Sequence, residues 1–137
     1  FMSGSNCLRQ LTFGYLDMAW FGNDNDVDNV DKFEHEAINK TLLRNPDTPK
    51  ASISTQLGHI FAGGYSAGYY SYKWAEVLDA DAFEKFKEDG IFNRDTAKSF
   101  RDNILSQGNK EHPMKLYKAF RGREPKVEAL LTREGLN

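Results

Sequence analysis

Four of the six tyrosines lie within eight residues, next to a histidine and a pair of glycines. The residues of this group are His59, Gly63, Gly64, Tyr65, Tyr69, Tyr70 and Tyr72. A phenol is neutral near pH 7 and can donate a hydrogen bond to a carbonyl oxygen or a developing oxyanion. The group predicts a site for a polar ligand, and the alternative is a packed interface, where tyrosines also cluster.

A helix is the element expected to carry these tyrosines. If it runs from Tyr65 to Asp79, a turn of about 100° per residue aligns three phenols and an acid on one stripe, namely Tyr65, Tyr69, Tyr72 and Glu76. The opposite side is apolar and is expected in the core, with Tyr70, Trp74, Val77 and Leu78. The preceding Gly63-Gly64 pair permits unusual backbone angles, a close backbone approach or a hinge. The pattern therefore predicts one phenolic face and one buried face.

The bulk composition excludes several classes of protein. A chain of 137 residues suits one domain, and a net charge of -2 with both signs dispersed gives no basic surface for nucleic acid. No apolar run is long enough to cross a membrane. Cys7 is the only cysteine, which excludes an internal disulfide and fits a reducing compartment, so we expect a cytoplasmic protein. Helical spacing starts almost at the first residue without a secretory signal, so we expect a fragment of a longer chain.

Glycine and proline punctuation separates segments of helical period and predicts an all-α fold. The expected helices span about 5–20, 27–43, 65–79, 82–88, 94–107, 114–120 and 126–134. Asn45 to Pro49 is expected to end the second of these. Asn93 is an expected N-cap, Pro113 and Pro125 suit first turns, and the expected stops are Gly90, Gly108, Gly122 and Gly135.

No metal site is predicted from this chain's own motifs. His35-Glu36-Ala37-Ile38-Asn39 differs by one residue from the His-Glu-x-x-His zinc helix, but asparagine is a poor zinc ligand, and 31–34 resembles an exposed helix face. The acidic loop 22–26 lacks the spacing of an EF-hand. His112 is expected to start a helix, and Arg121-Gly122-Arg123-Glu124 is expected to be a salt-linked turn at a helix end.

The stretch from His59 to Val77, HIFAGGYSAGYYSYKWAEV, closely resembles the C-terminal signature of the thimet oligopeptidase family, which includes oligopeptidase A and the peptidyl-dipeptidases. The resemblance continues through 79–83, 90–93, 100–106 and 120–125, and Leu16 to Trp20 matches upstream. It therefore covers nearly the whole chain.

The resemblance implies a largely helical zinc peptidase that cleaves short peptides in a deep channel. It implies that Tyr65 and Tyr72 are catalytic donors to the substrate carbonyl or oxyanion, and that His59, Gly63, Gly64 and Tyr69 bind the peptide. The family's zinc ligands and catalytic glutamate belong to an earlier segment that this chain does not contain. Residues 1–137 would then form one helical segment of the catalytic domain, without bound zinc and inactive alone.

Two functions remain open at this point. The chain is either part of a peptidase active site or a free-standing helical module that binds peptides or proteins without catalysis. In the first case its partners are short peptides and the missing N-terminal part of the same chain. The apolar surface left without that part would favour self-association.

Overall fold

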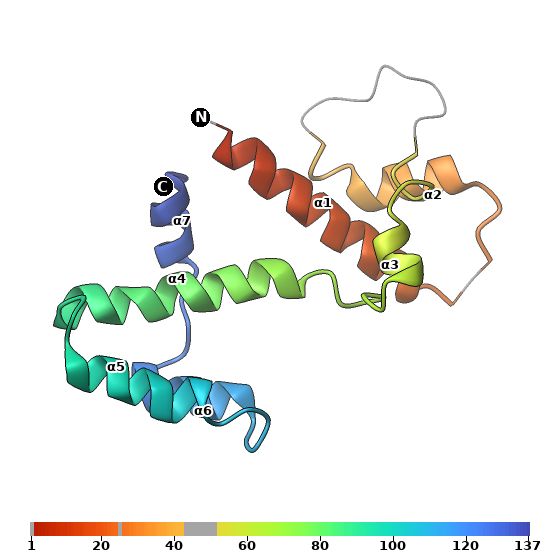
Figure 1. Cartoon of the computed structure of the whole chain (residues 1–137). Coiled ribbons are helices and arrows are strands. Elements are labelled where there is room, and N and C mark those ends of the chain that lie inside the picture. Colours follow the sequence, from red (N-terminus) through yellow and green to blue (C-terminus); the bar gives the residue numbers. More distant parts are fainter. Residues whose placement is uncertain (1, 25, 43–51) are drawn as a thin grey trace. The chain divides into compact units, whose positions relative to one another are not determined.

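The computed structural model describes residues 2–24, 26–42 and 52–137. Its elements are α1 (Ser3–Phe21), α2 (Val30–Ile38), α3 (Gly58–Ala62), α4 (Ser71–Asp89), α5 (Arg94–Phe100), the π-helix η1 (Arg101–Leu105), α6 (Pro113–Arg121) and α7 (Glu128–Glu134), as Figure 1 shows. The described residues contain no strand, which confirms the all-α prediction. Among these helices, none is long and apolar enough to cross a bilayer.

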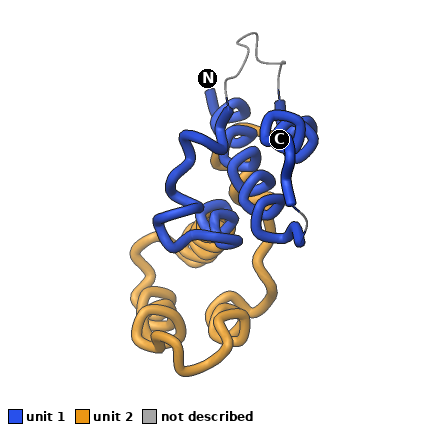
Figure 2. The backbone as a smooth tube through the Cα atoms, turned by 90° about the vertical axis from the view of Figure 1, so that its right-hand side faces the viewer, with its two compact units in different colours: residues 1–73 blue, residues 74–137 orange. Residues whose placement is uncertain are grey.

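The chain divides into two compact units, Phe1–Lys73 and Trp74–Asn137, and the boundary falls in the first turn of α4 (Figure 2). In unit 1, α1 packs against α2. The buried side chains at its centre are Leu16, Ile38 and Ile60. The ring of Trp20 packs against Phe33, 4.5 Å between centroids, and against Phe61 at 5.9 Å. The core of unit 1 therefore joins α1 to both α2 and α3.

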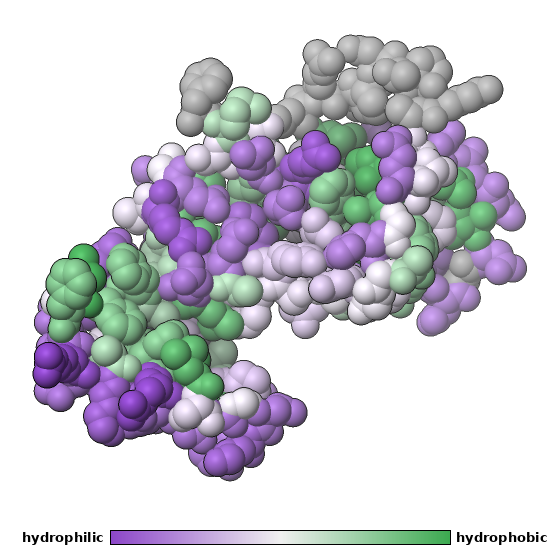
Figure 3. All heavy atoms as spheres, viewed as in Figure 1, coloured by the Kyte–Doolittle hydropathy of each residue, from purple (hydrophilic) through white to green (hydrophobic). Residues whose placement is uncertain are grey.

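Unit 2 has a separate core between α4 and α6. Its buried residues are Ala82, Tyr117 and Phe120, and the partly buried Leu78, Phe86, Phe100 and Ile104 pack around them. Hydrophobic residues also remain exposed on α4 and on the segment between α4 and α5, as the green surface of unit 2 in Figure 3 shows. Among them are Trp74, Phe83, Ile91 and Phe92. Trp74 was expected in the core, but 44% of its surface is exposed.

Local signals for helix ends are mostly confirmed. The Asn93 side chain accepts hydrogen bonds from the amides of Asp95 and Thr96 and caps α5. His112 caps α6 in the same way, with Pro113 in its first turn. Gly122 and Gly135 end α6 and α7 with positive φ angles, which glycine adopts without steric cost. Pro125 was wrongly predicted in a first turn, since α7 begins at Glu128.

Several helix boundaries differ from prediction. The second helix begins only at Val30, because the Asn29 side chain accepts from the amide of Lys32 and caps it, and it ends at Ile38. The predicted helix 94–107 is α5 followed by the π-helix η1. The predicted stop near Asp79 is wrong, because α4 continues unbroken to Asp89. The Asn45 to Pro49 break and part of the acidic loop, Asn25, lie outside the described residues.

The largest correction concerns the tyrosine segment. The predicted helix from Tyr65 is wrong, because 66–70 form turns and α4 starts at Ser71. Ala67 has φ +53°, a left-handed value that interrupts any right-handed helix. Of the three phenols expected on the stripe, only Tyr72 is therefore on the helix, together with Glu76.

Candidate functional site

Four aromatic side chains of unit 1 form one cluster, which we call the four-ring cluster: His59, Tyr65, Tyr69 and Tyr72. The His59 and Tyr65 rings stack with centroids 4.2 Å apart and planes at 17°. Tyr65 stacks on Tyr72 at 5.5 Å, and Tyr69 tilts against Tyr72 at 5.1 Å. The fold therefore brings together four of the residues that the sequence singled out, although they do not share a helix.

Polar atoms of the cluster also meet. His59 Nε2 lies 3.0 Å from the Tyr72 hydroxyl, in an exposed contact whose donor depends on the imidazole tautomer. A hydrogen bond with Tyr65 is the main cause that raises the pKa of Tyr72. Because a raised pKa disfavours the phenolate, Tyr72 keeps its proton near neutral pH. Tyr72 can therefore act as a hydrogen-bond donor at the surface.

The Tyr69 phenol is more enclosed than that of Tyr72. Its hydroxyl donates to Gln10 Oε1 at 2.9 Å, and its ring meets the ring of Phe13 edge-on with centroids 5.6 Å apart. Burial raises the pKa of Tyr69, against smaller opposing effects of Arg9 and Gln10. The proton of Tyr69 is thus directed toward α1.

The glycine pair shapes the connection between His59 and Tyr65. Gly63 follows α3, and a Cβ there would lie 2.5 Å from the His59 carbonyl oxygen, too close for any side chain. Gly64 has φ +77°, which glycine adopts readily. The pair therefore ends α3 and turns the chain, so that the Tyr65 ring returns over His59.

Asp17 of α1 holds residues 66–70, which we call the tyrosine turn. This role was not identified from the sequence. The side chain of Asp17 is completely buried. Oδ1 accepts the amide hydrogen of Ala67 and Oδ2 accepts that of Tyr69, each at 2.9 Å. The only available signal was a charged residue between Leu16 and Met18 in a largely apolar helix. That signal could not name the partner, which lies 50 residues away.

Glu34 of α2 is a second buried carboxylate with the same kind of role. It accepts the amide hydrogens of Ile53 and Ser54 at 2.8 and 2.7 Å, in the segment that leads into α3. Burial raises the pKa of Glu34, but these bonds and those from the Ser52 and Ser54 hydroxyls lower it more, so the pKa lies below its usual value. The predicted exposed face of α2 is therefore wrong at Glu34, which is 6% exposed.

Not every aromatic residue of the segment joins the four-ring cluster. Within the described residues, Tyr70 has no ring contact with these four, and 57% of its surface is exposed. Tyr70 lines a cavity of about 200 Å³ together with Tyr69, Tyr72 and the α1 residues Leu11, Tyr15 and Met18. Apolar surface therefore lies directly beside the polar atoms of the cluster.

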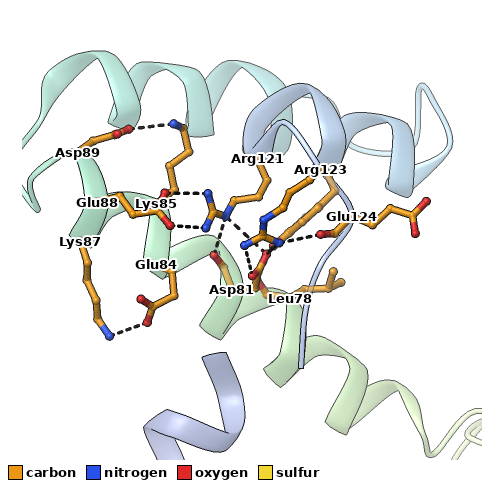
Figure 4. A network of polar contacts seen from close by, with 11 residues as sticks. Leu78, Asp81, Glu84, Lys85, Lys87, Glu88, Asp89, Arg121, Arg123 and Glu124 are labelled. Atoms are coloured by element: carbon orange, nitrogen blue, oxygen red, sulfur yellow. Dashed lines mark hydrogen bonds and ion pairs between the residues drawn. The ribbon is translucent and has the colours of Figure 1, made fainter. Parts of the chain in front are cut away.

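A different polar network holds unit 2 together (Figure 4). Asp81 of α4 is 1% exposed and accepts from Tyr117 Oη at 2.6 Å and from Arg123 Nη2 at 2.7 Å. Arg121 donates to the Asp81 carbonyl oxygen and binds Glu88 through two nitrogens. All these partners belong to unit 2, and their ion pairs confirm the predicted salt-linked turn at the end of α6.

The charge of Asp81 is stabilised by this network. Burial raises the pKa of Asp81, but hydrogen bonds from Arg123 and Tyr117, with the charges of Arg123 and Arg121, lower it more. The pKa of the carboxyl group therefore lies below its usual value. Asp81 remains ionised and paired with the arginines at neutral pH.

The described residues do not fit a zinc site. No group of three or more His, Cys, Asp or Glu side chains among them is arranged to hold a metal ion. His35 lies within α2, and Asn39, at the position of a second zinc histidine, is the C-cap of that helix.

A family model and individual relatives indicate the same protein family. A family model described as Peptidase family M3 matches residues 1–136. Oligopeptidase A of Escherichia coli is 48% identical over 132 residues, which cover 94% of this chain and 19% of that protein. Oligopeptidase A of Haemophilus influenzae is 45% identical, covering 99% of this chain and 20% of that protein. Dipeptidyl carboxypeptidase of Escherichia coli is 37% identical over 100% of this chain and 20% of its own length.

The chain thus spans about a fifth of the length of these curated relatives. The match covers both units and the four-ring cluster. This chain belongs to peptidase family M3.

Proposed function

We propose that this chain is the substrate-binding part of a zinc metallopeptidase that hydrolyses short peptides. The observation that carries the proposal is the 3.0 Å contact of His59 Nε2 with the Tyr72 hydroxyl beside the stacked Tyr65 ring. Membership of peptidase family M3 supports a peptide as the ligand. The names oligopeptidase and dipeptidyl carboxypeptidase among its relatives favour short substrates.

The chemistry assigned to this chain is hydrogen-bond donation. During hydrolysis the attacked carbonyl oxygen gains negative charge, and donors aimed at it stabilise the transition state. If the imidazole of His59 carries its proton on Nε2, it donates to Tyr72, and the Tyr72 proton can turn from Tyr65 to the substrate. Tyr65 is the second catalytic donor, and His59, Gly63, Gly64 and Tyr69 bind the peptide.

The zinc of the intact enzyme belongs, in this proposal, to residues outside this chain. The described residues lack a ligand set for it. The chain alone would therefore bind peptide weakly and hydrolyse nothing. Turnover by the purified chain that survives chelation would contradict the proposal.

Two conservative substitutions in the intact peptidase test the role of the donors. Tyr72→Phe removes one hydroxyl, and losing such a donor lowers kcat by about a hundredfold to a thousandfold. Zinc content and thermal stability should change little, because Tyr72 is 40% exposed. Tyr70→Phe is the matched control, since Tyr70 lies two residues away and outside the four-ring cluster. Equal and small effects of the two changes on steady-state kinetics would contradict the proposal.

The exposed apolar residues of α4 and of the segment between α4 and α5 suit contact with other parts of the longer peptidase. Phe92 is 96% exposed, Ile91 56% and Phe83 45%. An apolar patch of this kind favours association when nothing covers it. The isolated chain should therefore self-associate at high concentration, as measured by sedimentation. A strictly monomeric chain would argue against this contact surface.

A further inference from the structure

One face of α1 contacts the tyrosine turn through three side chains. Gln10, Phe13 and Asp17 lie three and four residues apart, a spacing that puts side chains on the same face of a helix. Gln10 accepts from the Tyr69 hydroxyl, Phe13 packs edge-on against the Tyr69 ring, and Asp17 accepts from the Tyr69 amide. This face therefore touches Tyr69 at its hydroxyl, its ring and its backbone.

Asp17 also holds a backbone conformation that the turn would not keep unaided. Ala67 has φ +53°, a left-handed value that residues with a Cβ rarely adopt. Such a conformation persists only when surrounding contacts impose it. The bond from the Ala67 amide to the fully buried Asp17 carboxylate is one such contact.

Backbone and ring contacts connect Tyr69 to the other rings of the cluster. The Tyr72 amide donates to the Tyr69 carbonyl oxygen at 3.2 Å, and the two rings lie 5.1 Å apart. Ser66 of the same turn donates through Oγ to the carbonyl oxygen of Ile60 at 2.6 Å, next to His59. A shift of the turn therefore moves Tyr72 and His59 relative to each other.

We propose that this face of α1 positions the hydrogen-bond donors of the four-ring cluster, with Asp17 as the main positioning residue for Tyr69 and Tyr72. The proposal rests on the proposed function, because it assigns Asp17 a role in the same reaction. Asp17 touches no substrate. It acts through the backbone of the turn, and Gln10 supports it at the Tyr69 hydroxyl.

Asp17→Asn in the intact peptidase tests this role with little change of shape. A carboxylate offers two acceptor oxygens, whereas an amide offers one acceptor and one donor, so one bond to Ala67 or Tyr69 must break. Misplacing a catalytic group by about 1 Å costs about a hundredfold in rate, so kcat should fall by about tenfold to a hundredfold. Hydrogen exchange at residues 64–72 should become at least about tenfold faster.

Asp81→Asn is the matched control, because it makes the same change at an equally buried aspartate outside the four-ring cluster. It should lower the melting temperature and leave kcat within about twofold, as expected for a residue that acts on stability alone. If Asp81→Asn lowers kcat as much as Asp17→Asn, the effect is a general loss of stability and the proposal is wrong.

A double-mutant cycle separates positioning from an independent effect. In the Tyr72→Phe background the donor is already absent, so Asp17→Asn should lower kcat by no more than about threefold. If Asp17→Asn lowers kcat by the same factor in the Tyr72→Phe enzyme as in the unchanged enzyme, the proposal is wrong. An impaired Tyr72→Phe enzyme beside a normal Asp17→Asn enzyme would contradict only the role of Asp17. An unchanged Tyr72→Phe enzyme would contradict the proposed function itself.

Gln10→Ala provides a second variant if Asp17→Asn does not fold. Gln10 is only partly buried, and its loss frees the Tyr69 hydroxyl without leaving a buried charge. We expect kcat to fall by about threefold to tenfold, with the same dependence on Tyr72. A normal kcat in Gln10→Ala, with hydrogen exchange at residues 64–72 unchanged, would overturn the proposal.

Discussion

Asp17 in unit 1 and Asp81 in unit 2 are equally buried, yet they bind different partners. Among the residues that the structure describes, Asp17 accepts from backbone amides alone, those of Ala67 and Tyr69. Asp81 accepts from side chains, the Tyr117 hydroxyl and the Arg123 guanidinium. A carboxylate bonded to amides determines the path of a loop and the side chains on it. A carboxylate bonded to cationic side chains cross-links helices and neutralises charge.

Glu34 extends the comparison within unit 1. Two of its partners are also backbone amides, those of Ile53 and Ser54, and they lie in the loop before α3. Both loops that flank α3 are therefore held by buried carboxylates from α1 and α2. In unit 2, by contrast, the charged network joins α4 to the end of α6 (Figure 4). In unit 1 the buried carboxylates therefore hold loops beside the four-ring cluster, whereas in unit 2 the network links α4 to the end of α6.

The largest expected effect is the loss of Asp81. Asp81→Ala removes the carboxylate, only 1% exposed, that accepts from the Arg123 guanidinium and the Tyr117 hydroxyl, while Arg121 keeps its two bonds to Glu88. Breaking a buried pair in this way costs about 3–5 kcal/mol. Hydrogen exchange of α6 amides should report this loss as a lower opening free energy. If Asp81→Ala lowers the opening free energy of α6 by less than Asp17→Ala lowers that of residues 64–72, the comparison between the two aspartates is reversed.

Acidification should weaken the same network. The pKa of Asp81 is lower in the folded protein than in the unfolded chain, so its stabilising contribution is complete above the unfolded value and is lost as pH falls through the folded value. Glu34 acts in the same direction. The melting temperature should therefore fall below about pH 4, and less steeply in Asp81→Asn. An identical pH dependence in the variant would contradict the assignment to Asp81.

Tyr117→Phe tests one bond of the network. Its hydroxyl donates to the Asp81 carboxylate at 2.6 Å in the buried core of unit 2. A hydrogen bond to a charged group contributes about 1.5–3 kcal/mol, and the unfolding free energy should fall by this amount. Tyr70→Phe is the exposed control and should change stability by no more than about 0.5 kcal/mol. Equal effects in denaturant titrations would mean that this bond contributes little.

The smallest expected effect concerns the strained residue of the tyrosine turn. Ala67→Gly removes a left-handed cost of about 1–2 kcal/mol but adds about 0.4–1 kcal/mol of unfolded-state freedom, so a small net stabilisation should result. Ala97→Gly in α5 is the matched control, and helix propensity predicts a loss of about 0.5–1 kcal/mol there. Melting temperatures should therefore change in opposite directions. A loss at both positions would show that Ala67 carries little strain.

Local features were predictable because they depend on neighbouring residues. Asn93 caps α5 through amides two and three residues away, and Gly122 and Gly135 end helices by their own backbone freedom. The residues of the four-ring cluster were identified for a related reason, since His59 and three tyrosines lie within 14 positions. Close spacing in the sequence is therefore enough to indicate that these rings lie near one another.

The path of the tyrosine turn was not predictable, because it depends on residues far away in the chain. Helical spacing placed Tyr65 and Tyr69 on a helix, but Asp17 binds the amides of Ala67 and Tyr69 across 50 and 52 positions. Glu34 was interpreted as exposed for the same reason, since its partners Ile53 and Ser54 lie 19 and 20 positions away. No local pattern specifies which amide a buried carboxylate will meet.

Periodicity, capping and close spacing were enough to predict the helical class, several helix ends and the residues of the four-ring cluster. That the cluster forms around a turn, and that Asp17 and Asp81 have different partners, follows from the folded arrangement of the chain. The physical reason is that a buried carboxylate must find hydrogen-bond donors, and packing alone determines which donors are within reach.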